Sequence, residues 1–314
     1  MSILFFTPLT ALLLLAIITT VNSCLPSELA ALNAFKSSLR EPNTGIFNSW
    51  TGTDCCHNWF GVSCDENTRR VADINLRAGT LYTTFEKAHR PGYMTGQISP
   101  EICKLTQLSS ITITDWNGIS GEIPRCISSL SFLRIIDLAG NRISGTLPSD
   151  IGKLKHLSRL SLADNAIIGR IPLSLTNITS LTHLDLRNNR ISGSIPLGCG
   201  KLQNLGRALL SGIIPKSLLT SGISDLNLSH NKLEGNIPDG FGSRSYFTSL
   251  DFSYNNLKGP IPKSISSASY IGYIDLSHNH LCGPIPKVLD NLDASSFEYN
   301  ACLCGKPLKT CKVN

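Results

Sequence analysis

Charged residues are scarce in this sequence of 314 residues: Asp, Glu, Lys and Arg make up 16%, and the formal net charge is +6. So low a charge density excludes a disordered chain and a strongly charged nucleic-acid-binding tail. Beyond residue 23, no apolar run is as long as a membrane span, and no hydrophobic tail ends the sequence. The sequence also lacks a nucleotide-binding loop and a serine–histidine hydrolase pattern, so neither enzyme class is indicated.

Residues 1–23 contain no Asp, Glu, Lys or Arg, and their apolar run ends in Val21-Asn22-Ser23, which suits signal peptidase at positions −3 and −1. We therefore expect a signal peptide over residues 1–23 and a mature protein that begins near Cys24. The alternative is a short membrane anchor, but the run from Ala11 to Ile18 is too brief for a good span. The expected location is the extracellular space or cell wall, with no membrane span in the mature protein.

One phrase is repeated at a fixed spacing in the middle of the sequence. Its asparagines and its prolines each recur every 24 residues, at Asn141, Asn165 and Asn189 and at Pro148, Pro172 and Pro196. The pattern LxxLxxLxLxxNxLxGxIP at such a period is the signature of a leucine-rich-repeat solenoid. The predicted fold is an α/β solenoid, a right-handed leucine-rich-repeat horseshoe with a parallel β-sheet on its concave face and disulfide-stapled N- and C-terminal caps.

Each repeated residue type has a physical reason for its position. Leu160 and Leu162 flank one exposed residue, so they alternate as a short strand whose apolar side faces inward. One coil cannot bury that side alone, whereas stacked coils form a continuous core. The asparagine ends the strand by turning its amide into the coil, where it can satisfy backbone groups of its own and the next coil. The Ile-Pro pair forms the far turn, where no ladder hydrogen bond is needed.

The expected domain organisation follows from where this pattern holds. Residues 24–70 are expected to form the N-terminal cap, with a helix from Ser27, its N-cap, to Leu39 and with Trp50 and Trp59 over the open end of the core. Residues 71–286 are expected to form about nine coils, and residues 287–314 the C-terminal cap.

Three irregularities interrupt the repeats. An oversized loop from Thr80 to Met94 follows the first strand, and one extra residue in a later coil places Trp116 in the usual asparagine position. Between Asn189 and Asn231 there are 42 residues where two periods need 48. Spacing from Ala208 to Pro215 predicts that the coil near 202–219 has lost its asparagine position and part of its turn. A natural short coil and a gene-model deletion both explain this loss.

Several stretches resemble a known family. The cap CLPSELAALNAFKSSL with CCHNWFGVSC, together with the repeats, is similar to plant extracellular leucine-rich-repeat proteins, including the polygalacturonase inhibitors. FEKAHRPGYMTG, DWNGISGEIPRCI and SFEYNACLCGKPLKTC resemble the DNA-damage-repair/toleration type of these plant proteins. The resemblance implies four disulfides, namely Cys24–Cys55, Cys56–Cys64, Cys282–Cys302 and Cys304–Cys311.

The pairing of the other cysteines is less determined. Cys103 and Cys126 occupy similar positions in adjacent coils and are candidates for a fifth disulfide, which leaves Cys199 as a buried thiol. A zinc site made by the N-terminal cysteines and His57 is an alternative that an exported chain disfavours, because thiols oxidise outside the cell. We therefore expect no metal and no cofactor.

Two glycosylation sequons begin at Asn177, on the convex side, and at Asn227, on the concave sheet. The exposed residues between the paired strand leucines are expected to run across the concave face as Asn75, Thr112, Asp137, Ser161, Asp185, Leu209, Asn227, Asp251 and Asp275. Asp251 and Asp275 would stand about 4.8 Å apart, as a glycosidase pair does, but an open surface that does not exclude water argues against catalysis. His230 and His278 lie two coils apart, too far to share a zinc ion.

The position just before the first strand leucine holds Arg159, His183 and Arg207, beside Asp137 and Asp185. This basic row flanked by acids is the predicted ligand site, with the loop from Thr80 to Met94 as the alternative.

The sequence leaves three functions open. The first is a secreted recognition protein, not an enzyme, that binds an extracellular or cell-wall protein, a polysaccharide-degrading enzyme, a receptor or a wall polymer, in defence or signalling. A DNA-repair role and a wall-polysaccharide enzyme are the alternatives. The acid-rich concave face and apparent export argue against nucleic acid as a partner.

Overall fold

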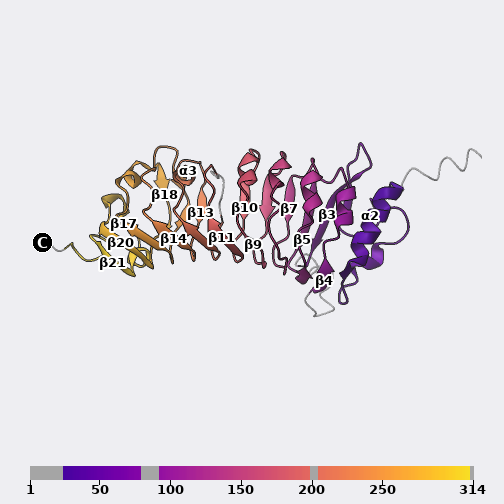
Figure 1. Cartoon of the computed structure of the whole chain (residues 1–314), viewed down its shortest axis with the longest axis horizontal. Coiled ribbons are helices and arrows are strands. Elements are labelled where there is room, and N and C mark those ends of the chain that lie inside the picture. The colour runs from indigo at the N-terminus through magenta and orange to yellow at the C-terminus, as the bar shows by residue number, and fades with distance from the viewer. Residues whose placement is uncertain (1–23, 79–91, 199–203, 312–314) are drawn as a thin grey trace, which may run out of the picture.

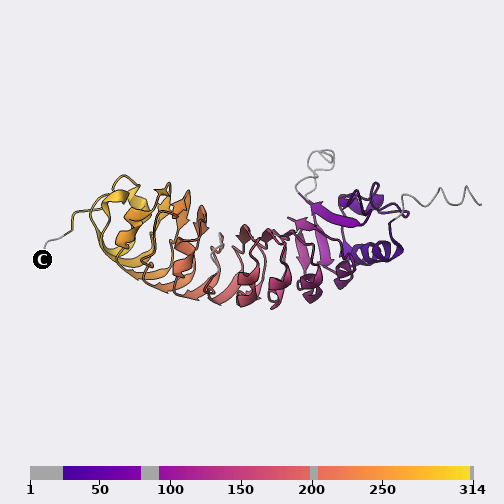
Figure 2. The same cartoon turned by 90° about the horizontal axis from the view of Figure 1, so that it is seen from above.

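The coils of the chain follow one another from helix α2 (Pro26–Ser37) to strand β21 (Asn300–Cys304) (Figure 1). Seen from above, the row of coils bends into an arc (Figure 2). This computed structural model describes residues 24–78, 92–198 and 204–311. The predicted signal peptide, most of the loop from Thr80 to Met94, and Cys199 lie outside these ranges. Within the described ranges, no helix is long and apolar enough to cross a membrane.

The N-terminal cap consists of α2, β1 (Leu39–Arg40), the 3-10 turn η1 (Ile46–Ser49) and β2 (Val62–Cys64). Leu32 and Phe35 are fully buried, and the ring of Trp50 stacks on that of Trp59 with centroids 5.0 Å apart, so the cap closes the core as predicted. The predicted helix start was wrong: Leu25 is the N-cap residue and Pro26 opens the helix. Proline suits the first turn because its missing N–H would be unpaired there in any case.

The concave sheet lines one face of the solenoid, and its strands are parallel except for the cap strand β2. Six strands have the order β10-β8-β7-β5-β3-β2, and three more have the order β13-β16-β19. Bridges from Asp185 to Asn204 and from Asn204 to Asn227 join the two parts. The bounds are β3 Val71–Arg77, β5 Ser110–Thr114, β7 Ile135–Asp137, β8 Arg159–Ser161, β10 His183–Asp185, β13 Asp225–Asn227, β16 Ser249–Asp251 and β19 Ile274–Asp275.

A second parallel sheet, the side sheet, follows the turn after the concave strands in the order β21-β20-β17-β14-β12-β11-β9. Its bounds are β9 Ile168–Gly169, β11 Arg190–Ser194, β12 Leu209–Gly212, β14 Lys232–Gly235, β17 Asn256–Gly259, β20 Asn279–Pro284 and β21 Asn300–Cys304. Near the N-terminus, β4 (Met94–Gln97) pairs with β1 and with β6 (Asn117–Ser120), and a short pair joins β15 (Tyr246–Phe247) to β18 (Tyr270–Ile271).

Short helical turns complete the coils on the side opposite the concave sheet. All but one are 3-10 turns, because each Ile-Pro turn leaves only a few residues before the next strand. Their bounds are η3 Pro100–Lys104, η4 Arg125–Ser129, η5 Ile151–Lys153, η6 Leu173–Asn177, α3 Lys216–Leu219, η7 Lys263–Ser267, η8 Lys287–Leu289 and η9 Ala294–Phe297.

A column of asparagines links each coil to its neighbour. The Asn165 Nδ2 donates to the carbonyls of Leu162 and Ala163 in its own coil and of Leu138 in the preceding one, and its Oδ1 accepts the N–H of Ile143. The amide therefore satisfies the preceding coil, where the sequence predicted the next one. Trp116 takes this position in its coil as predicted, and its buried indole N–H donates to the Leu76 carbonyl at 2.9 Å.

The short coil differs from its prediction. Leu205 takes the place of the second strand leucine, because its N–H bonds the Asn227 carbonyl as the Leu186 N–H bonds that of Asn204. From Pro196 to Leu205 there are 9 residues, against 14 from Pro172 to Leu186, so five of the six missing residues precede the strand. The turn from Leu205 to Pro215 keeps its full length of 10 residues, and Ala208 occupies the asparagine position.

Among the described residues, five disulfides hold the two ends of the solenoid and one early coil. They join Cys24 to Cys55, Cys56 to Cys64, Cys103 to Cys126, Cys282 to Cys302 and Cys304 to Cys311. These are the four pairs implied by the resemblance and the fifth pair that the spacing suggested. The terminal coils are thus fastened covalently, as a small secreted cap requires.

Candidate functional site on the concave face

One row of side chains crosses the whole concave sheet because neighbouring strands pair in register. We call it the middle row, and its spacing from strand to strand is about 4.8 Å. The predicted place of Leu209 in this row was wrong, because Leu209 lies in side-sheet strand β12. The row consists of Asn75, Thr112, Asp137, Ser161, Asp185, Asn204, Asn227, Asp251 and Asp275.

The structure brings together four of the five predicted ligand-site residues. Arg159 and His183 pair in register on β8 and β10, and Asp137 and Asp185 lie in the middle row beside them. Arg159 is exposed, and none of the ion pairs among the described residues uses it. Arg207 does not belong to this row: it lies beyond the strand, in the turn, with φ 53°, because the residues missing from the short coil precede its strand.

The predicted exposure was wrong at three positions of the middle row, because Thr112, Ser161 and Asp185 are buried. Asp185 is the most buried carboxylate of the predicted ligand site, at 5% exposure. Burial raises its pKa, while the backbone N–H and the charge of Arg187 act in the opposite direction. That N–H donates to Asp185 Oδ1 at 3.2 Å, and the Arg187 Nε lies 3.6 Å from Oδ2. Asp185 is thus partly neutralised by its own coil, which leaves Arg159 as the charge that a partner can meet.

The carboxylates at the C-terminal end of the middle row are fixed by local turns. Asp251 Oδ1 accepts the N–H and the hydroxyl of Ser253, and Asp275 Oδ1 accepts the N–H of Ser277. Such Asx turns explain why the residue type recurs, since the side chain ends the strand. They also hold the second oxygen of each carboxylate in place, and the Tyr273 hydroxyl donates to Asp275 Oδ2 at 3.4 Å.

A stack of aromatic rings, which the sequence analysis missed, runs beside these carboxylates. Ring centroids are 4.2 Å apart from His230 to Tyr254, 3.9 Å from Tyr254 to His278 and 4.1 Å from His278 to Tyr299. We call these four residues the aromatic ladder. Tyr254 separates the two histidines, so they do not meet at one ion. The signal was in the sequence, because residues 230, 254 and 278 recur with the period of 24.

Charges from the concave strands reach this ladder. Burial lowers the pKa of His230, the Arg207 charge lowers it further, and Asp251 opposes both. Burial raises the pKa of Tyr273, and the charges of Asp275 and Asp251 add to that rise. The charges of both aspartates thus act on His230 and on Tyr273.

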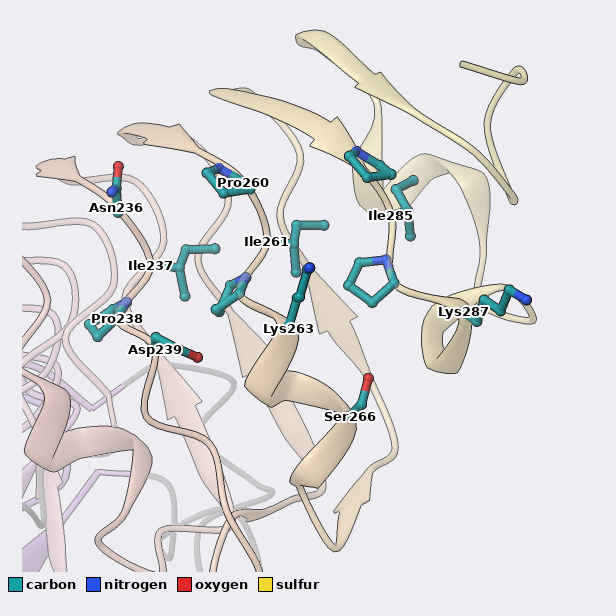
Figure 3. A pocket seen from close by; sticks show the side chains of 13 residues that line it. Asn236, Ile237, Pro238, Asp239, Pro260, Ile261, Lys263, Ser266, Ile285 and Lys287 are labelled. Carbon is teal, nitrogen blue, oxygen red and sulfur yellow. The ribbon is translucent and has the colours of Figure 1, made fainter. Parts of the chain in front are cut away.

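An apolar groove lies elsewhere in the same coils, along three successive Ile-Pro turns (Figure 3). Its volume is about 1020 Å³, and Ile237, Ile261 and Ile285 form its floor with their buried side chains. Lys263 and Lys287 extend from the short helical turns at its rim. Nothing in the groove specifies one occupant, so the concave face remains the better-defined site.

The cysteines of the N-terminal cap bear on the zinc alternative. The sulfur atoms of Cys24, Cys55, Cys56 and Cys64 all lie within 4.8 Å of one another. They form two disulfides, which leaves no thiolate to bind a metal ion. His57 Nδ1 lies 2.9 Å from Asp54 Oδ1, so this ring nitrogen is engaged within the cap.

The two sequons differ in accessibility. Asn177 is exposed on η6, whereas Asn227 is half-buried in the middle row, and its Oδ1 accepts from the N–H and hydroxyl of Ser229. Glycan attachment at either site stays a prediction.

Comparison with known proteins agrees with the fold. Residues 25–65 match the leucine rich repeat N-terminal domain, and residues 131–191, 222–243, 246–268 and 271–292 match leucine rich repeats. The chain is therefore a leucine-rich-repeat protein with an N-terminal cap of this class.

Its relatives are plant proteins. DNA damage-repair/toleration protein DRT100 of Arabidopsis thaliana is 54% identical over 44% of this chain and 37% of its own length. Polygalacturonase inhibitor 1 of Oryza sativa subsp. japonica is 33% identical over 37% of this chain and 31% of its own length. The matched stretches thus span about a third of these two relatives.

Solved structures of plant proteins share the solenoid. A plant ice-binding protein superposes with a TM-score of 0.73 at 28% identity, over 93% of this chain and 99% of that one. The plant peptide hormone receptor RGFR1, solved in complex with RGF2, superposes with a TM-score of 0.56 at 31% identity, over 67% of this chain and 35% of that one. This chain is accordingly an extracellular-type leucine-rich-repeat protein similar to polygalacturonase inhibitors and peptide-receptor ectodomains.

Proposed function

We propose that this chain is a secreted recognition protein that binds an extracellular or cell-wall protein across its concave face, in defence or signalling. The observation that carries the proposal is the uninterrupted middle row, with the unpaired guanidinium of Arg159 and the imidazole of His183 beside it. An open, pre-organised surface of mixed charge suits a protein partner, because charge complementarity directs encounter and register. Similarity to polygalacturonase inhibitors supports a pectin-degrading enzyme as the partner to test first.

The test compares two double variants of equal charge change. Arg159→Ala with His183→Ala changes the concave face, and Arg125→Ala with His156→Ala removes the same two residue types, both exposed, at or near the opposite short helical turns. We expect the concave variant to inhibit a polygalacturonase at least tenfold less than the parent, with an unchanged melting temperature. The control variant should inhibit like the parent. A concave variant that inhibits fully would place the site elsewhere, with the loop from Thr80 to Met94 as the next place to change.

The two alternative functions have less support. The name of DRT100 refers to DNA damage, but four aspartates in the middle row repel a phosphate backbone. Localising the protein in plant tissue tests this, since a nuclear protein would exclude the proposal. An enzyme acting on wall polysaccharide would need Asp251 and Asp275 as its acid pair, and an assay for pectin cleavage tests that directly.

The side sheet of this chain lacks the regular array of like side chains that ice binding requires, although the fold is similar to that of a plant ice-binding protein. The surface of an ice crystal repeats identical groups at one spacing, so a protein that binds ice needs similar side chains in a regular array. The exposed residues before the buried side-sheet leucines and isoleucine are instead unlike one another: Arg190, Leu209, Lys232, Asn256 and His280.

A further inference from the structure

The aromatic ladder occupies a position where the fold asks only for a backbone conformation. Residues just before the asparagine column have φ between 52° and 69° in this solenoid. In the N-terminal half the position holds Gly140, Asp164 and Asn188, which tolerate that left-handed region easily. Histidine also occurs in that region more often than most residues, whereas tyrosine is uncommon there, so the scaffold does not explain Tyr254 and Tyr299 or the stacking of the four rings.

The rings also contribute little to the core. Tyr254 is 43% exposed and Tyr299 is 70% exposed, and His230 is exposed as well. Their contacts are with one another, so each ring loses conformational freedom before any partner arrives. Tyrosine side chains held rigid at a surface are common in protein interfaces, because they offer large contact area at low entropic cost.

The charge beside the ladder is negative. Asp225, Asp251 and Asp275 lie on the neighbouring concave strands, and Glu298 directly precedes the last ring. None of these four carboxylates takes part in an ion pair among the described residues. Arg207, at the end of the ladder next to His230, is a cation whose charge lowers the pKa of His230.

We propose that the aromatic ladder and the carboxylates beside it form a docking surface for an extended, cationic peptide segment, rich in Arg or Lys, of the partner protein. Guanidinium and ammonium groups bind carboxylates and also lie favourably against tyrosine rings. The rings extend over three ring-to-ring steps of about 4 Å, a length that four residues of extended chain cover. The inference rests on the proposed recognition function and names the chemistry of the bound segment.

The test uses a fluorescein-labelled peptide of eight residues, alternating Arg and Ser, and a matched peptide of Glu and Ser. Fluorescence anisotropy measures binding to the full secreted protein. Tyr254→Ala with Tyr299→Ala should weaken binding of the Arg peptide at least tenfold while leaving the net charge unchanged. Asp251→Asn with Asp275→Asn should weaken it to a similar degree, because asparagine keeps the turn but loses the charge. The Glu peptide should not bind saturably.

A matched control is available in the same coils. Tyr246 and Tyr270 also stack, at 5.0 Å, and are about as exposed as Tyr254, but they belong to the short pair of strands that precedes the concave strands. Tyr246→Ala with Tyr270→Ala should change binding less than twofold. Tyr254→Phe keeps the ring and should bind within threefold of the parent, which separates a lost contact from a misfolded coil.

Several results would overturn the inference. The Arg peptide could fail to bind, could bind the ladder variant as well as the parent, or could depend more on the Tyr246 pair. Saturable binding of the Glu peptide or of an oligogalacturonide to the ladder would show the opposite chemistry. These failures differ from failure of the proposed function, because polygalacturonase inhibition sensitive to Arg159 and His183 would persist through all of them.

Discussion

The concave surface has different chemistry on the two sides of the short coil, although the backbone is the same. On the N-terminal side, Arg159 and His183 lie beside Asp137 and Asp185, and the following turns carry small or polar residues such as Asn188. On the C-terminal side, aspartates lie beside the aromatic ladder. The difference shows that the positions facing outward vary independently of the leucines and asparagines that build the coil.

The asparagine column, by contrast, is nearly the same in the two halves. Asn255 and Asn279, in the C-terminal half, make the same four hydrogen bonds as Asn165 and Asn189 in the N-terminal half. Ala208, in the short coil between them, interrupts the column, as Trp116 does near the N-terminal end. Function therefore has to be sought in columns where the two halves differ, and stability in columns where they agree.

Loss of a disulfide should have the largest effect on stability, and the effect should be concentrated at one end of the solenoid. Removing Cys282–Cys302 by Ser substitution should cost about 2–5 kcal/mol of stability, mainly in the C-terminal half, because coils contact only their neighbours. Trp50, Trp59 and Trp116 are the only tryptophans of the chain, so their fluorescence reports on the N-terminal half. The urea midpoint measured by tryptophan fluorescence should therefore fall less than the midpoint measured by hydrogen exchange of residues 246–300.

The matched disulfide, Cys103–Cys126, lies near the other end. Its removal should reverse the pattern, with the larger shift in tryptophan fluorescence. Equal shifts by both probes in both variants would show that the solenoid unfolds as one unit.

Asn255→Ala should have the next largest effect. The side chain donates to three carbonyls and accepts the Leu233 N–H, and all are buried or nearly so. Leaving these groups unpaired should cost about 2–4 kcal/mol, measured by urea unfolding at pH 7. A loss below about 0.5 kcal/mol would mean that water replaces the amide and that the column is not what joins the coils.

Ala208→Asn tests the interruption of the column in the short coil and should stabilise the protein by about 1 kcal/mol. The new Oδ1 would meet the Ile191 N–H, by analogy with Asn231 and the Leu210 N–H. Hydrogen exchange around residues 205–215 should slow. Faster exchange in this variant would show that the short coil has closed around the alanine methyl group.

Much of this scaffold could be predicted from the sequence, because each coil repeats the same local requirement. The leucine core, the asparagine column and the indole of Trp116 in that column followed from spacing alone. The position of the missing residues did not follow from spacing. Counting from Ala208 to Pro215 assigns them to the turn, whereas the hydrogen bonds between coils show that the strand of Leu205 pairs in register.

The candidate site was only partly predictable for the same reason. Arg159 and His183 follow from strand periodicity, but Arg207 depended on the misplaced deletion. The aromatic ladder depends on contacts between rings 24 residues apart or nearly so, in a turn that a single coil presents as an ordinary loop. Comparing the same position in successive repeats reveals the ladder, whereas motifs sought along the chain do not.

Asp185→Asn should have the smallest effect on stability, and the size of that effect should depend on pH. Burial raises the pKa of Asp185 in the folded state, so its ionised form destabilises the fold as pH rises through that range. Asparagine serves the same row position at Asn204 and Asn227, and it removes this cost. The melting temperature of the variant should therefore exceed that of the parent near pH 7, and the difference should vanish near pH 3, where both side chains are neutral. A difference independent of pH would show that the charge is not the cause.

The measurement that tests the difference between the two halves most directly is hydrogen exchange by mass spectrometry with and without the arginine–serine peptide. The account predicts slower exchange in peptides that cover β13, β16, β19 and the turns of His230, Tyr254 and His278. Exchange in β7, β8 and β10 and in the 3-10 turn η7 should not change. Equal protection of both halves, or protection confined to residues 135–185, would contradict the claim that the two halves offer different chemistry on one scaffold.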